Sequence, residues 1–122
     1  MSISRVVPDI QSDNLDESRE FYVGLFGFTV VMDLGWIMTL ASPTNPAAQL
    51  TVMRHDASSQ LVPQVSVQVA DVDALHAEAV RRGVPVVYPL TDEPWGVRRF
   101  FVRDPNGVVI NVMCHRPSAA AS

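Results

Sequence analysis

Cysteine is almost absent from this chain of 122 residues, in which Cys114 is the one example. A lone thiol cannot close a disulfide within the chain, and no cysteine pair has the spacing of a zinc or redox motif. Residues 1–5 also lack the basic and apolar segments with which a secretory signal begins. Together these absences predict a cytoplasmic protein.

Long apolar runs and clustered positive charges are missing as well. No segment approaches the roughly 20 apolar residues that a membrane-spanning helix requires. The chain holds 9 Lys and Arg against 13 Asp and Glu, for a net charge of −4. Nucleic-acid backbones are bound by clustered basic side chains. We therefore expect neither a membrane nor a nucleic acid as a partner.

The sequence does have enough apolar residues, 48% of the total, for one domain with its own core. It also contains a weak internal repeat. Asn14 and Asp71 each begin a pattern typical of a helix, Gly27 and Gly83 end the two patterns, and the matching residues lie 57 and 56 positions apart. In the first helix, Glu17 at the third helical position would complete the N-terminal cap.

Segments with an apolar period of two surround each helix and predict strands. We predict a single domain over residues 1–122, made of module one (3–57) and module two (62–116), with a tail at 117–122. The expected strands are 5–11, 28–32, 36–40 and 49–53 in module one, and 65–69, 84–88, 99–102 and 108–113 in module two. The tetrapeptide Asp104-Pro105-Asn106-Gly107 is a strong turn signal between the last two strands.

Segment 64–69 predicts how one strand divides its side chains between the two faces of a sheet. Val65, Val67 and Val69 alternate with Gln64, Ser66 and Gln68. The valine face would meet the helix. The polar face of an antiparallel sheet is solvated by default, and it can also line a binding site.

Two segments resemble the glyoxalase, bleomycin-resistance and extradiol-dioxygenase superfamily, also called vicinal oxygen chelate proteins. One is Ser-Arg-Glu-Phe-Tyr-Val-Gly-Leu-Phe-Gly-Phe at 18–28, and the other runs from Glu93-Pro94-Trp95-Gly96 through Arg103-Asp104-Pro105-Asn106-Gly107. The resemblance implies an α+β fold in which two βαβββ modules form a curved mixed sheet cup around a ligand. It also implies a homodimer.

Metal-dependent members of that family place a His or Gln on the first strand of each half and a Glu near the end of each half. The matching positions here are Val7, Gln49 or Thr51, Gln64 and Asn111. Valine cannot coordinate a metal, and neutral amides or a hydroxyl supply no charge to offset the lost hydration of a divalent cation. We therefore expect no divalent metal and no other cofactor.

The resemblance then implies a cup that binds a small organic ligand through polar side chains. The expected ligand-binding residues are Asp9, Gln11, Trp36, Gln49, Thr51, Gln64, Ser66, Gln68 and Asn111. Asp9 is the one carboxylate expected inside the cup, either as a general base or as a charge that attracts a cationic ligand. Trp36 and Trp95 suit stacking on a flat ligand as well as core packing.

Other residues with reactive or charged side chains give weaker signals. The three histidines, His55, His76 and His115, fall outside the ligand positions, and we expect them on the surface. Arg98, Arg99 and Arg103 form the one basic cluster, which predicts a solvated sheet edge or a clamp on an anionic group.

The favoured hypothesis is a metal-free binding protein similar to bleomycin-resistance and related antibiotic-sequestering members, because sequestration requires affinity only. One alternative is an enzyme, a lyase, isomerase or dioxygenase resembling glyoxalase, with a metal held partly by Gln64. Another alternative is a vestigial dimer with a purely structural role.

Overall fold

The computed structural model describes residues 2–116 and divides them into two compact units. The first-half unit contains residues 7–64, and the second-half unit contains residues 2–6 together with 65–116. The backbone N–H of Ala70 donates to the carbonyl of Ser2 at 3.1 Å, which ties the N-terminal residues to the second-half unit. The predicted tail at 117–122 lies outside the described residues.

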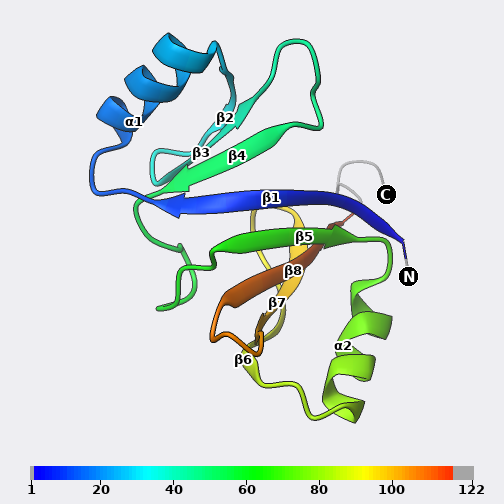
Figure 1. Cartoon of the computed structure of the whole chain (residues 1–122). Helices are drawn as coiled ribbons and strands as arrows, with labels where there is room; N and C mark the ends of the chain where they lie inside the picture. The colour runs from blue at the N-terminus through cyan, green and yellow to red at the C-terminus, as the bar shows by residue number, and fades with distance from the viewer. Residues whose placement is uncertain (1, 117–122) are drawn as a thin grey trace. The chain divides into compact units, whose positions relative to one another are not determined.

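Each half has the predicted order of strand, helix and three strands (Figure 1). The first half comprises β1 (Ile3–Gln11), α1 (Leu15–Phe21), the π-helical turn η1 (Tyr22–Phe26), β2 (Thr29–Asp33), β3 (Ile37–Ala41) and β4 (Gln49–Met53). The second half comprises β5 (Val65–Val69), α2 (Val72–Arg81), β6 (Val86–Asp92), β7 (Val97–Arg103) and β8 (Val109–His115). The α+β class and the two βαβββ modules are confirmed.

Both units mix parallel and antiparallel strand pairs. In the first-half unit the order is β2-β3-β4-β1, with β1 parallel to β4 and the other pairs antiparallel. In the second-half unit the order runs β5-β8-β7-β6, with β5 parallel to β8 and the remaining pairs antiparallel. The same pairing plan therefore recurs in the two halves, as the internal repeat predicts.

The first helix begins where the sequence predicts but changes character before its end. The side-chain oxygen of Asn14 accepts from the backbone N–H of Glu17 at 3.0 Å, whereas the N–H of Asn14 donates to Ser12 Oγ and not to the Glu17 side chain. The last five residues form the π turn η1, in which Tyr22 and Phe26 stack with ring centroids 6.2 Å apart. Gly27 ends the turn with a φ of 80°, a conformation that favours glycine.

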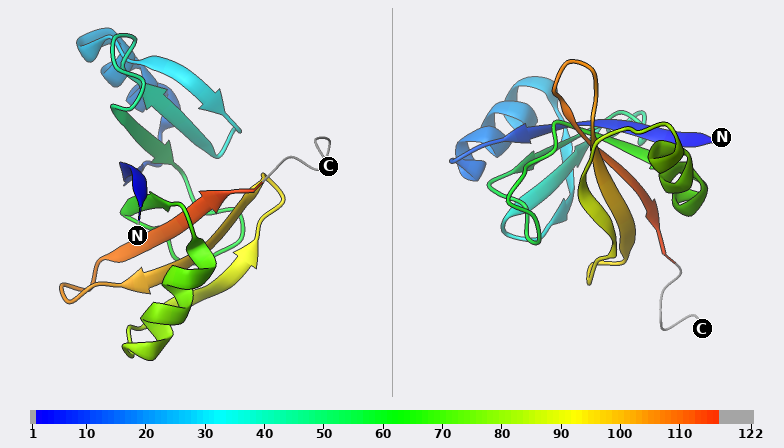
Figure 2. Two further views of the ribbon diagram at one scale, coloured as in Figure 1. Left: turned by 90° about the vertical axis from the view of Figure 1, so that its right-hand side faces the viewer. Right: turned by 90° about the horizontal axis from the view of Figure 1, so that it is seen from below.

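The second helix follows its prediction closely. Asp71 accepts from the backbone N–H of Ala74 at 3.0 Å, and Gly83 follows the last turn with a φ of 71°. Its apolar side packs on the sheet, where the core of the second-half unit consists of Val69, Val72, Ala79, Phe100 and Val112. Figure 2 shows α2 lying across one face of the strands β6 to β8. In the first-half unit the corresponding core is Leu15, Met38, Leu40 and Val52.

The turn between β7 and β8 is confirmed in detail. Asp104 Oδ1 accepts from the backbone N–H groups of Asn106 at 2.8 Å and Val108 at 2.9 Å, and Gly107 has a φ of 82°. The hydrogen bond from Val108, followed by those from Asn106, lowers the pKa of the Asp104 carboxyl below its ordinary value.

The largest departure from the predicted strands is β6. The sequence predicts a strand at 84–88, whereas β6 extends to Asp92 through Pro89, with two irregularities in its pairing to β7. β6 lies at the outer edge of the second-half order, where a proline without an N–H group is tolerated. Among residues 2–116, no helix is long and apolar enough to cross a bilayer.

Candidate functional site

The face of the second-half sheet that turns away from α2 carries a row of side chains from three strands. Ser66 on β5 is paired with Asn111 on β8, and Asn111 is paired with Phe101 on β7. Because side chains alternate along a strand, these three residues share one face, opposite the face that holds Phe100 and Val112 against α2. We call this side of the sheet the Asn111 face.

Asn111 has one satisfied and one unsatisfied polar atom. Its Nδ2 donates to Ser66 Oγ at 3.0 Å, while Oδ1 is buried and accepts no hydrogen bond from residues 2–116. Only 9% of the residue is exposed. A buried acceptor left without a donor costs about 1–3 kcal/mol, so Oδ1 has a strong tendency to accept from any N–H or O–H group brought to it.

A buried ion pair lies on the same face of the unit, and the sequence did not predict it. Arg99 Nε is 2.6 Å from Glu93 Oε2, and only 4% and 3% of the two side chains are exposed. The Tyr88 hydroxyl donates to the same carboxylate oxygen at 2.9 Å. Arg99 is paired with Met113, which follows Asn111 by two residues on β8 and so shares its face.

Three aromatic rings surround the Arg99 guanidinium. Its central carbon lies 4.7 Å from the ring centroid of Phe101, 5.0 Å from that of Trp95 and 5.1 Å from that of Tyr88. These distances are within the range of cation–π attraction, which adds to the ion pair where water is excluded. Trp95 therefore contacts this ion pair, within the turn from Glu93 to Gly96 that joins β6 to β7.

The predicted basic cluster of three arginines does not exist as a cluster. Arg98 bonds to Asp73 and Asp92, Arg99 is buried, and Arg103 donates to the carbonyl of Gly107. Alternation along β7 sends Arg98 and Arg99 to opposite faces of the sheet. The prediction that the three arginines together form a solvated sheet edge or a clamp on an anion was therefore wrong. Counting the alternation of side chains from Val97 would have placed Arg98 and Arg99 on opposite faces.

The predicted site residues of the first-half unit lie mainly on β1 and β4. Asp9 is half-buried and paired with Thr51, which is buried, so the parallel register brings Thr51 level with Asp9 and leaves Gln49 two residues further back. Val7 is buried on the same side of β1. Gln49 Nε2 donates to the carbonyl of Pro46 at 2.8 Å.

The remaining predicted residues have local partners. The Gln64 carbonyl accepts from the backbone N–H of Asp9 at 2.9 Å, and the exposed Gln11 Nε2 donates to the carbonyl of Arg54 at 3.5 Å. Trp36 stacks on the exposed His55 ring at 5.9 Å. Gln68, half-buried on β5, is paired with Met113, two residues beyond Asn111.

The carboxylate most deeply buried in the second-half unit is Glu93, whereas the sequence predicts Asp9 as the buried carboxylate of the site.

The three histidines differ in how far they are exposed. His76 is half-buried and packs edge-on against Phe100 with centroids 4.9 Å apart, while His55 and His115 are exposed. Partial burial, followed by the positive charge of Arg5, lowers the pKa of His115 below its ordinary value.

The donor set does not fit a divalent metal ion. Within residues 2–116 no three or more His, Cys, Asp or Glu side chains group closely enough to hold one. At the positions implied by the family resemblance stand a buried valine, neutral amides and a hydroxyl, and the Nδ2 group of Asn111 is committed to Ser66. Such groups supply none of the charge that hard cations require.

Comparison with known proteins places the chain in a family. A family model described as the Glyoxalase/Bleomycin resistance protein/Dioxygenase superfamily matches residues 2–112. None of the curated proteins matches the chain. A solved structure of a member of this superfamily from Vibrio splendidus is 18% identical, with a TM-score of 0.70 over 93% of this chain and 99% of the other.

Two further solved structures have the same fold under different names. A chain described as NAD-dependent benzaldehyde dehydrogenase from Legionella pneumophila is 17% identical, with a TM-score of 0.74 over 91% of this chain and 99% of its own. Methylmalonyl-CoA epimerase from Streptomyces coelicolor, in complex with 2-nitronate-propionyl-CoA, is 22% identical, with a TM-score of 0.64 over 94% and 97% of the two chains. Likeness at these identities establishes a fold and not an activity. Since the family model matches nearly the whole chain, this protein belongs to the Glyoxalase/Bleomycin resistance protein/Dioxygenase superfamily.

Proposed function

We propose that this protein binds a small organic molecule without a metal ion and that the Asn111 face forms part of its binding site. The observation that carries the proposal is the buried Oδ1 atom of Asn111, to which no group in residues 2–116 donates. A ligand N–H or O–H group would satisfy it. A ligand that donates this hydrogen bond removes the free-energy cost of the unpaired acceptor in the free protein, and this gain favours binding.

The surroundings of Asn111 favour a neutral ligand with an apolar or aromatic body. Phe101 is paired with Asn111 on β7, Met113 lies two residues further along β8, and Ser66 on β5 supplies a second polar group. The Arg99 charge on the same face is already balanced by Glu93, so the ion pair offers little net charge to an ionic ligand. We retain Asp9, Gln11, Trp36, Gln49, Thr51, Gln64 and Gln68 as proposed ligand-binding residues.

A ligand screen on protein without a His-tag tests this proposal. Thermal denaturation is followed in the presence of several hundred organic compounds that each carry an N–H or O–H donor, and stabilising compounds are titrated by calorimetry. We expect the Kd of a stabilising compound to rise at least tenfold in Asn111→Ala, equivalent to about 1.4 kcal/mol. The control is Asn106→Ala, which removes an exposed amide from the β7–β8 turn and should leave the Kd unchanged.

A screen without any stabilising compound would contradict the proposal and favour the vestigial structural role. Equal loss of affinity in the two variants would contradict the assignment of Asn111. Stabilisation that requires an added divalent metal would instead favour a glyoxalase-like lyase or dioxygenase.

We also propose that the protein is a cytoplasmic homodimer. The first-half unit exposes several large apolar side chains on α1, η1 and the strand β2, namely Phe21, Leu25, Phe26, Val31 and Met32. Phe21 and Phe26 lie edge to face with ring centroids 6.0 Å apart, and exposed apolar side chains that gather in this way favour an interaction site. Light scattering after gel filtration should give twice the chain mass, and Leu25→Asp should give a monomer, whereas Val80→Asp on α2 should remain a dimer.

A further inference from the structure

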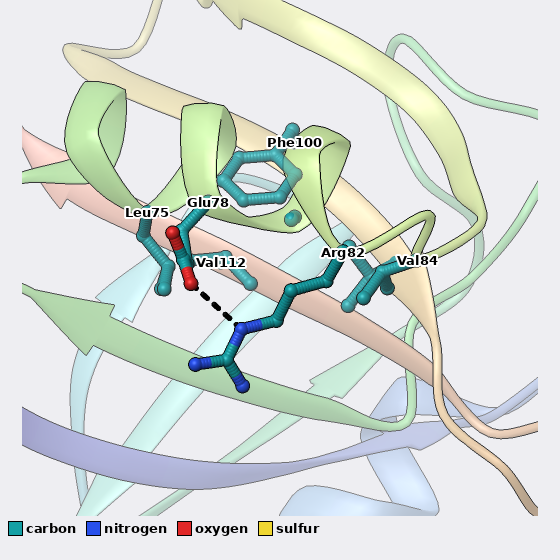
Figure 3. Close-up of a pocket in the computed structure, with 8 residues that line it drawn as sticks. Leu75, Glu78, Arg82, Val84, Phe100 and Val112 are labelled. Carbon is teal, nitrogen blue, oxygen red and sulfur yellow. Dashed lines mark hydrogen bonds and ion pairs between the residues drawn. The ribbon is translucent and has the colours of Figure 1, made fainter.

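An apolar cavity lies beneath α2, on the face of the second-half sheet opposite Asn111. Its volume is about 500 Å³, and its lining consists of Leu75, Glu78, Ala79, Arg82, Val84, Phe100, Val102 and Val112. Figure 3 shows Leu75 and Glu78 on the helix, Arg82 just after it, and Phe100 and Val112 on the strands below. The proposed function makes no use of this cavity.

The cavity exists because the helix side chain above this part of the sheet is small. Ala79 is the residue of α2 that faces the core here, and Val84 and Val102 are half-buried and line the side. The volume falls within the range of about 300–1,000 Å³ that is typical of small-molecule sites. Six of the eight lining residues are apolar, so the cavity suits the apolar body of a ligand.

The charged residues that line the cavity are Glu78 and Arg82. Glu78 forms ion pairs with both Arg81 and Arg82, with 2.7 Å between Glu78 Oε1 and Arg82 Nε. Hydrogen bonds from Arg81 and then from Arg82 lower the pKa of Glu78 from 4.5 to about 2, so this carboxylate is ionised at neutral pH. Two guanidinium groups therefore share one carboxylate.

Arg82 differs from Arg81 in its relation to the cavity. Arg82 is one of the lining residues and Arg81 is not. Arg82 Nε donates to Glu78 Oε1, and the two terminal nitrogens of Arg82 have no partner among residues 2–116. These are the donors with which arginine binds carboxylates and other oxyanions.

We propose that this cavity binds a small amphipathic anion, with its apolar body against Leu75, Val84 and Phe100 and its negative group on the terminal nitrogens of Arg82. A suitable probe is 1-anilinonaphthalene-8-sulfonate, whose fluorescence rises in apolar surroundings. N-phenyl-1-naphthylamine has the same rings without the sulfonate and reports on the apolar part alone.

Each probe is titrated by fluorescence into the full-length protein and three variants. Ala79→Leu fills the cavity and should weaken both probes at least tenfold. Arg82→Gln should weaken the sulfonate at least fivefold while changing the affinity of the neutral probe less than twofold. Arg81→Gln is the matched control, because Arg81 also pairs with Glu78 but does not line the cavity, and it should affect the sulfonate less than twofold.

Because Arg82 is exposed, Arg82→Gln keeps the test valid even if Ala79→Leu fails to fold. Equal affinities of the sulfonate for wild type and Arg82→Gln would overturn the proposal. The proposal would also be overturned if the methyl resonances of Val84, Val102 and Val112 did not shift when the sulfonate is added. A failure here would leave the Asn111 proposal intact, because the two sites lie on opposite faces of the sheet.

Discussion

The buried ion pair between Glu93 and Arg99 leads to the strongest prediction about stability. Glu93→Gln keeps the shape of the side chain and an oxygen for the Tyr88 hydroxyl, but it removes the negative charge. Arg99 then carries a charge that is 96% removed from solvent and loses its ion pair with Glu93. Breaking one partner of such a pair typically costs about 3–5 kcal/mol.

The rings around Arg99 do not replace the lost counterion. Cation–π attraction contributes about 0.5–2 kcal/mol and is present before and after the substitution. The full cost should therefore be visible in urea denaturation. With a denaturant slope of about 1–3 kcal/mol per molar, the midpoint should fall by roughly 2 M.

A double substitution separates the cost of breaking the Glu93–Arg99 ion pair from general damage to packing. Glu93→Gln combined with Arg99→Met removes both charges and should recover at least half of the lost free energy of unfolding. Glu78→Gln, in an exposed ion pair, is the control and should lower the midpoint far less than Glu93→Gln does. A midpoint shift in Glu93→Gln no larger than that in Glu78→Gln, or a double variant less stable than the single one, would contradict a stabilising role of this ion pair.

Three further predictions concern local features. Asp71→Ala removes the cap of α2 and should lower the free energy of unfolding by about 1 kcal/mol in urea denaturation, and no change would contradict the capping role. Because folding lowers the pKa of Glu78 from 4.5 to about 2, its contribution is present above pH 4.5 and is lost as the pH falls towards 2. Thermal denaturation across this window should show a steeper loss for wild type than for Glu78→Gln, and parallel curves would count against the pairing. His115 should titrate below the ordinary pKa of a histidine by NMR, and Arg5→Gln should raise its pKa, whereas an unaltered pKa would remove Arg5 as a cause.

Local signals in the sequence were sufficient to predict the order of the elements. Asn14 and Asp71 cap their helices as expected, because N-capping depends on residues within one turn. The Asp104 turn is local for the same reason. The π turn at Tyr22–Phe26 was not predicted, because the residue types that form it have the same spacing as an ordinary helix end.

The parts of the candidate site that the sequence could not predict depend on how the strands and the helix pack and bury their side chains. Glu93 is six positions from Arg99 and looks like an ordinary surface carboxylate in a turn, yet the β6–β7 hairpin buries both. The cavity beneath α2 depends on how Ala79 sits over the sheet and has no sequence signal. Ser66 and Asn111 were predicted to belong to one site, and the structure joins them by a hydrogen bond.

We propose that the polar site of this superfamily member works without a metal. Inductively coupled plasma mass spectrometry of protein purified without a His-tag, followed by thermal denaturation with added Ni, Zn, Mn or Fe, tests it most directly. We expect far less than one metal ion per chain and no stabilisation by any of the four metals. A stoichiometric metal, or a metal-induced stabilisation that Asn111→Ala removes, would contradict it.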